Sequence, residues 1–165
     1  MSIEQFLRLE RYPSPIYFSP FTDPLAEAAQ DSLLRVLRRV LPFGVRVAIS
    51  TKAVVPDSIF QLLSQWGDHV LFFVGGTSLD EDRNASVEPH CPPAGLRLQN
   101  VRRAREYGLT QLSARLDPLL PDVDDDPDRL CRLLDRAAEA GARQVTASYL
   151  FLTPLCNRDR LSRRP

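Results

Sequence analysis

The sequence predicts an α/β fold, a partial TIM-like (β/α) barrel built around a parallel sheet. Short apolar runs alternate along the chain with stretches of helical periodicity. Each apolar run is followed at once by small polar or charged residues, which is typical of strands that lead into a binding site. The chain has 165 residues, whereas a closed eight-stranded barrel needs about 200 or more. We therefore expect part of a barrel, with one edge and the inner face of its sheet uncovered.

The chain begins with a segment at residues 1–14 whose short amphipathic pattern predicts one to three helical turns. The first strand is expected at Ile16–Phe18. A helix is expected over Ala26–Val40, because its apolar residues recur every three or four positions. Pro42 and Gly44 follow it and are typical of a helix end.

The rest of the chain continues this alternation. Apolar, β-favouring runs predict buried strands, and amphipathic runs that end at glycine predict the helices. The long polar segment Asp80–Pro93 is expected to be a functional loop, since connections of this length are uncommon in compact α/β domains. Further strands are expected at Val45–Ser50, Val70–Val74, Leu109–Leu116 and Gln144–Leu152, and further helices from Pro56 to Gly67, at Leu96–Tyr107 and at Asp128–Ala140.

Polar residues follow four of the predicted strands. Because the carboxyl ends of parallel strands meet at one edge, we expect these residues to share one rim. Taken singly, each is more often a helix cap, a turn former or a solvated side chain. Together they suit a polar, partly anionic small molecule with hydroxyl and amino groups. The candidates are Ser19, Thr22, Asp23, Ser50, Thr51, Lys52, Gly75, Gly76, Thr77, Arg115 and Asp117, with Glu88 from the long polar segment.

Composition excludes few classes of function. Lys+Arg and Asp+Glu number 21 each, so no overall field favours nucleic acid, although such a partner is left open. No apolar run reaches the ~18 residues of a membrane span, and the first residues lack a signal-peptide layout. We therefore expect a cytoplasmic protein without a membrane partner. The three cysteines, Cys91, Cys131 and Cys156, are widely spaced, and no metal site is predicted.

Several short motifs occur in order between about residues 15 and 155. They are TDP at 22–24, STK at 50–52, TSLDED at 77–82, EP at 88–89 with proline and Arg97-Leu98 further on, REYG at 105–108, RLDPLLPDVDDDP at 115–127 and AAEAGARQVTASYLFLTP at 137–154. In this order they resemble radical S-adenosylmethionine proteins, most closely the spore-photoproduct-lyase-like (DNA repair photolyase-like) branch. No single motif is specific, and the resemblance rests on their order.

The resemblance implies a partial (β/α)6 barrel over residues 15–155. It also implies a four-iron, four-sulfur cluster that cleaves S-adenosylmethionine reductively to a 5′-deoxyadenosyl radical. Asp23, Lys52 and Arg115 would then line the cofactor site, and Glu88 would stabilise its surroundings. Lys52, the only lysine of the chain, would lie near the carboxylate of S-adenosylmethionine as a point charge.

Two features depart from the family's pattern. The CxxxCxxC loop that holds the cluster is absent, and the cysteines present have the wrong spacing to replace it. The resemblance places that loop before Pro15, so we expect the first β/α unit of the barrel to be missing. In addition, Gly75 stands where the family's strand commonly ends in serine.

Three hypotheses follow. The chain is a truncated or split radical lyase, completed by a segment or a second chain that supplies the missing unit. Alternatively, it is a catalytically inactive module that binds S-adenosylmethionine or a partner. The third hypothesis is a structural interaction module that uses its open sheet edge, for instance as a homodimer. The basic tail at residues 156–165 is expected to be disordered, and the substrate is left open.

Overall fold

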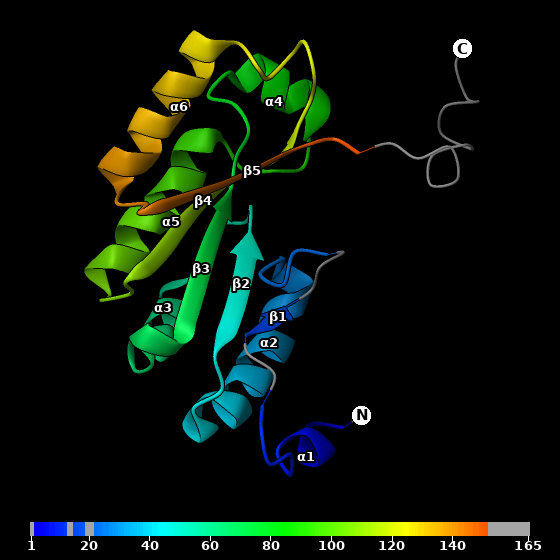
Figure 1. The fold of residues 1–165 in the computed structure, drawn as a ribbon, viewed down its shortest axis with the longest axis vertical. Coiled ribbons are helices and arrows are strands. Elements are labelled where there is room, and N and C mark those ends of the chain that lie inside the picture. Colours follow the sequence, from blue (N-terminus) through cyan, green and yellow to red (C-terminus); the bar gives the residue numbers. More distant parts are fainter. Residues whose placement is uncertain (1, 13–14, 19–21, 152–165) are drawn as a thin grey trace, which may run out of the picture.

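The computed structural model describes residues 2–12, 15–18 and 22–151. They form a five-stranded sheet in the order β1-β2-β3-β4-β5, and every neighbouring pair is parallel (Figure 1). This confirms the predicted α/β fold class, a partial barrel with a parallel sheet. Each crossover returns the chain to the same end of the sheet, so the carboxyl ends of the strands share one edge. The strands are β1 (Ile16–Phe18), β2 (Val47–Thr51), β3 (Val70–Gly75), β4 (Gln111–Leu119) and β5 (Gln144–Tyr149).

Four helices of eight residues or more connect the strands, and two shorter helices accompany them. Two single turns of 3-10 helix, η1 (Leu41–Phe43) and η2 (Gly67–His69), lead into β2 and β3. The described residues contain no helix that is both long enough and apolar enough to cross a membrane. The α-helices are α1 (Ile3–Phe6), α2 (Glu27–Val40), α3 (Asp57–Ser64), α4 (Glu81–Val87), α5 (Ala94–Glu106) and α6 (Pro127–Ala140).

The hydrophobic core lies between one face of the sheet and the helices. Alternate strand residues such as Ile49 and Phe72 are at most 1% exposed and belong to the same cluster as Leu37 and Phe60 of the helices. A second cluster joins the end of β4 to α6 through residues such as Leu133. The residues between these in the strands point to the opposite face, and that face carries the polar side chains described below.

Three predicted elements need correction. The segment Asp80–Pro93 is not a plain loop, because α4 occupies half of it. The Asp80 carboxylate accepts hydrogen bonds from the backbone N–H groups of Asp82 and Arg83 and so begins this helix. The fourth predicted strand runs on to Leu119 through the cis peptide Asp117–Pro118. The last strand ends at Tyr149, and its predicted end, Leu152, lies outside the described residues.

Candidate ligand-binding site

A cleft of about 440 Å³ opens at the carboxyl ends of β1 to β4. Parallel pairing brings its lining residues together, because the carboxyl ends of the strands lie at one edge of the sheet. Gly75, for example, lies directly beside Arg115 in the β3–β4 register. Eight of the residues that line the cleft were predicted from the sequence, and Tyr17 and Pro118 were not. The full lining is Tyr17, Thr22, Asp23, Ser50, Thr51, Lys52, Gly75, Arg115, Asp117 and Pro118.

Asp23 fastens the segment after β1 to the end of β2. Its carboxylate accepts hydrogen bonds from the Thr51 hydroxyl at 2.8 Å and from the Lys52 backbone N–H at 2.7 Å. The backbone N–H groups of Leu25 and Ala53 donate to the same carboxylate. Four donors leave little of its acceptor capacity for a ligand. Asp23 therefore shapes the floor of the cleft by holding backbone in place.

Lys52 projects from the end of β2 and pairs with Glu88, which follows α4. The other carboxylate oxygen of Glu88 accepts a hydrogen bond at 2.6 Å from Arg97, whose side chain is 1% exposed. Burial alone raises the pKa of Glu88, but hydrogen bonds and charge from Lys52 and Arg97 outweigh it, so that this pKa lies below its ordinary value. The result is a three-membered charge network that fixes the position of the lysine ammonium.

Gly75 makes room for this network. A Cβ at this position would lie 2.7 Å from Cγ of Lys52 and 3.0 Å from its Cε. The lysine stem therefore crosses directly over the glycine backbone on its way to Glu88. This close approach gives a physical reason for glycine where the resembling family has serine.

We expect Gly75→Ala to lower the free energy of unfolding by about 1–3 kcal/mol, the usual effect of inserting a methyl group where a packed side chain must shift. The new methyl group must displace the Lys52 stem and weaken its pairing with Glu88. Chemical denaturation measures the effect. Gly76→Ala is the matched control, because a Cβ there meets no atom within 4 Å. Equal stability of the two variants would contradict this account.

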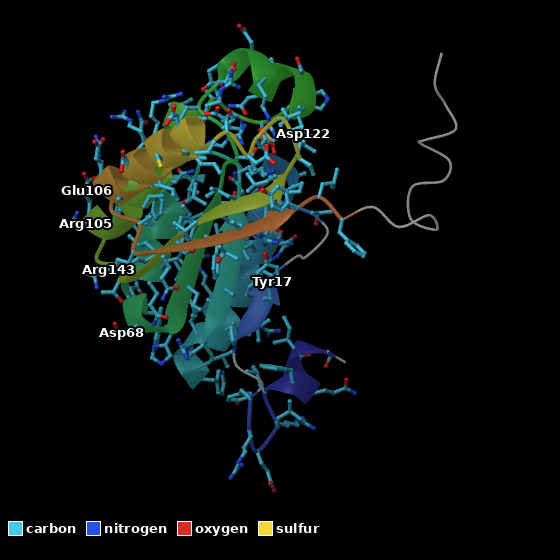
Figure 2. The ribbon with its side chains drawn as sticks, turned by 45° about the horizontal axis from the view of Figure 1, so that its top comes forward. Tyr17, Asp68, Arg105, Glu106, Asp122 and Arg143 are labelled. Atoms are coloured by element: carbon cyan, nitrogen blue, oxygen red, sulfur yellow. The ribbon has the colours of Figure 1, made fainter. Side chains whose placement is uncertain are left out.

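Arg115 and Asp117 form the other charged pair of the cleft. Nε of Arg115 lies 2.9 Å from Oδ2 of Asp117, and Nη2 lies 2.5 Å from the same oxygen. The remaining nitrogen, Nη1, donates to the Tyr17 hydroxyl and lies 3.4 Å from the Ser50 hydroxyl. Figure 2 labels Tyr17, whose ring centroid is 5.8 Å from the guanidinium carbon. Side chains from β1 and β2 thus contact the guanidinium of a residue on β4.

The cleft combines fixed charges of both signs. Burial raises the pKa of Asp117, but hydrogen bonds from Arg115 and Ser148 and the charges of Arg115 and Lys52 more than reverse this and lower it. Burial lowers the pKa of Arg115, and its contacts with Asp117 and Tyr17 raise it overall. Both groups therefore stay ionised at neutral pH. A zwitterionic ligand with hydroxyl groups matches this set of donors and acceptors.

Three predicted site residues do not line the cleft, and a fourth falls outside the part of the chain that the structure describes. Gly76 extends the β3–β4 pairing through its N–H to the Arg115 carbonyl at 3.0 Å. Thr77 is 3% exposed, and within the described part of the chain its hydroxyl has no hydrogen-bond partner. Glu88 contacts Lys52 and Arg97 instead of lining the cleft. Ser19 lies outside the described residues.

Sequence reasoning missed Tyr17 and Arg97. The signal for Tyr17 was available, because side chains alternate along a strand and Tyr17 must face away from Ile16 and Phe18. Arg97 was part of the motif order, but its burial and its role gave no such signal, since an arginine in a helix is usually solvated. Its burial is seen only in the folded chain, where Arg97 donates hydrogen bonds to Glu88 and to the carbonyl of Pro92, 2.6 Å from its Nε.

The described residues do not fit an iron–sulfur cluster. Among them, no three or more His, Cys, Asp or Glu side chains gather in a way that could hold a metal ion. The described cysteines are the half-buried Cys91 and the exposed Cys131. A cluster needs a set of thiolates, and these two residues do not supply it.

No known family profile matches the sequence. The chain is 29% identical over 141 residues to the uncharacterized protein ORF301 of Acidianus two-tailed virus, and the match covers 82% of this chain and 46% of that protein. The chain thus spans about half the length of this relative.

Three solved structures resemble the fold. Two are of SuiB from Streptococcus suis, one of them bound to S-adenosylmethionine, each with a TM-score of 0.60, 13% identity and coverage of 73% of this chain and 27% of SuiB. The third is a domain of the pyruvate-formate lyase-activating enzyme from Bacteroides vulgatus, with a TM-score of 0.54, 15% identity and coverage of 82% of this chain and 99% of the domain. The chain therefore shares with these proteins a partial barrel on a parallel sheet.

Proposed function

We propose that the cleft binds S-adenosylmethionine and that the chain is a radical S-adenosylmethionine-like domain. The observation that carries the proposal is the placement of Lys52, Arg115 and Asp117 in one cleft at the carboxyl ends of parallel strands. Support also comes from the order of the sequence motifs and from the likeness of the fold to that of SuiB, which has been crystallised with S-adenosylmethionine. The motif order favours the spore-photoproduct-lyase-like branch.

The ligand's chemistry matches the charges of the cleft. S-adenosylmethionine carries a carboxylate, an ammonium, a sulfonium and two ribose hydroxyls. The carboxylate suits the lysine ammonium or the guanidinium, and the ammonium suits Asp117. The hydroxyls suit Ser50 and Tyr17, which line the cleft. Two strong, fixed charges of opposite sign give the amino acid end of the ligand a defined orientation.

The proposal is a binding function for the described residues. An iron–sulfur cluster, where one is bound, supplies the electron that cleaves S-adenosylmethionine, and the described residues offer no thiolate set for it. Radical lyase chemistry therefore needs thiolates from outside the described residues or from another chain. The inactive binding module is the alternative form of the same proposal.

Titration calorimetry with S-adenosylmethionine tests the proposal. We expect Lys52→Ala to weaken binding by about tenfold or more, which corresponds to loss of one charge-assisted hydrogen bond. Arg136→Ala is a matched control, because this arginine is 62% exposed on α6 and lies outside the cleft. Thermal melts of both variants show whether each remains folded.

Two outcomes would reject this function. The first is the absence of measurable heat for the wild-type protein at millimolar ligand. The second is equal affinity of wild type and Lys52→Ala, which would remove the lysine from the site. Addition of a reconstituted cluster is not needed for either measurement, so the result does not depend on catalysis.

A further inference from the structure

Strand β5 is an uncovered edge of the sheet. It is the last strand in the sheet order, and it pairs only with β4 among the strands that the structure describes (Figure 1). All six of its residues are exposed. Val145 is 47% exposed, Tyr149 is 53% exposed, and Phe151 just beyond the strand is 83% exposed. A contiguous group of exposed apolar side chains along a free strand often marks an interaction site.

The composition of this edge favours pairing. Residues 144–151, QVTASYLF, contain no charge and no proline. Monomeric proteins usually protect a sheet edge with lysine, proline, a bulge or a very short strand. The opposite edge is short, because β1 has only three residues. Among the described strands, β5 is the longer of the two edges. The irregularity in its pairing is the register shift between Leu116 and Leu119, which lies on the β4 side.

We propose that β5 pairs antiparallel with β5 of a second copy of this chain, so that two five-stranded sheets become one. A two-fold axis perpendicular to the sheet keeps each side chain on its own face. Residues of one face must therefore oppose residues of the same face, so the two-fold axis passes through a residue of the strand. We place it at Ala147, one of the two central residues of Gln144–Tyr149. In this register Val145 lies opposite Tyr149, and Thr146 lies opposite Ser148.

Self-pairing suits the residues of this edge. An aromatic ring opposite a β-branched side chain, and two hydroxyls opposite each other, are favourable cross-strand pairs. Arg143 falls opposite Phe151, so the two copies place no like charges against each other. A charged partner such as nucleic acid would find no complementary charge along this strand. The contact is small by the standard of obligate dimers, so we expect a reversible, concentration-dependent dimer.

The edge is connected to the cleft. The Ser148 side chain of β5 hydrogen-bonds to Asp117, and Asp117 pairs with Arg115. Arg115 also lies directly beside Thr146 in the β4–β5 register. Dimerisation would therefore hold in place the strand that supports one wall of the cleft.

Sedimentation velocity over a range of concentrations tests the dimer. We expect the wild-type protein to associate and Thr146→Lys to weaken association by about tenfold, because the substitution puts lysine into both copies of the edge. Thr110→Lys is the matched control, since Thr110 is exposed just before β4 and is not part of β5. A wild-type protein that stays monomeric, or a dimer that Thr146→Lys leaves unchanged, would overturn the proposal.

Disulfide cross-linking tests the register. In a background where Cys91, Cys131 and Cys156 are replaced by serine, Ala147→Cys is expected to form a covalent dimer on mild oxidation. Two cysteines directly opposite each other in antiparallel strands come within disulfide range. Thr146→Cys is expected to cross-link poorly, because its opposite residue is Ser148. Efficient cross-linking of Thr146→Cys without that of Ala147→Cys would overturn the register.

Discussion

We expect Glu88→Ala to lower the free energy of unfolding by about 3–5 kcal/mol, the usual effect of removing one partner from a buried ion pair. Arg97 is the reason. Its side chain is 1% exposed, and its Nη2 already has no hydrogen-bond partner among the described residues. Without Glu88 the guanidinium keeps only the carbonyl of Pro92. Urea denaturation followed by circular dichroism measures the loss.

Two further variants separate charge burial from loss of side-chain contact. Glu106→Ala removes an exposed glutamate from the last turn of α5 and should change stability by no more than about 0.5 kcal/mol. The double variant Glu88→Leu with Arg97→Met removes both charges together. It should be clearly more stable than Glu88→Ala, because no unpaired charge is left buried. A double variant less stable than Glu88→Ala would show that the ion pair itself stabilises the fold.

The same carboxylate predicts how stability depends on pH. The pKa of Glu88 in the folded protein lies below its ordinary value of 4.5, so the unfolded chain binds this proton more readily than the folded chain. Its contribution to stability is present above about pH 4.5 and is lost as pH falls through the lower folded-state pKa. Denaturation curves collected at falling pH should therefore show a steeper loss in the wild type than in Glu88→Ala.

The sheet and its rim were predictable because their causes are local. Period-two burial and the polar residues after each strand are visible in the sequence, and parallel pairing then brings the rim together without further information. Thr51, Lys52 and Gly75 reach the cleft for this reason. The role of Asp23 was harder to predict from the sequence. Three of its four donors lie at the end of β2 and just after it, far from Asp23 in the chain, and the fourth lies two residues after Asp23.

The parts that escaped prediction depend on contacts between distant residues. Arg97 is buried only because Glu88, nine positions earlier, returns to it after α4. Gly75 looked like a turn residue, and its packing against Lys52 depends on the path of a side chain from the neighbouring strand. Leu134 lies four residues after Leu130 and three before Ala137, on the apolar stripe of α6, yet it is 36% exposed. Periodicity gives the face of a helix but not the extent of the surface that covers it.

Asp23→Ala is expected to lower the free energy of unfolding by about 2–3 kcal/mol, because it leaves several part-buried donors without their acceptor. The donors are the Thr51 hydroxyl and the backbone N–H groups of Leu25, Lys52 and Ala53. Asp23→Asn keeps one acceptor oxygen and should lose less. Asp31→Ala, on the exposed side of α2, is the control and should change little. Chemical denaturation of the three variants ranks them.

This experiment also separates the clamp from the ligand contact. Lys52 takes its position from the backbone that Asp23 holds, whereas the Asp23 carboxylate is already occupied by four donors. If Asp23 acts as a clamp, Asp23→Asn should bind S-adenosylmethionine nearly as well as the wild type under conditions where both are folded. If affinity falls by tenfold or more in a folded Asp23→Asn protein, the carboxylate contacts the ligand directly. The order of stabilities together with this affinity therefore decides which task Asp23 performs.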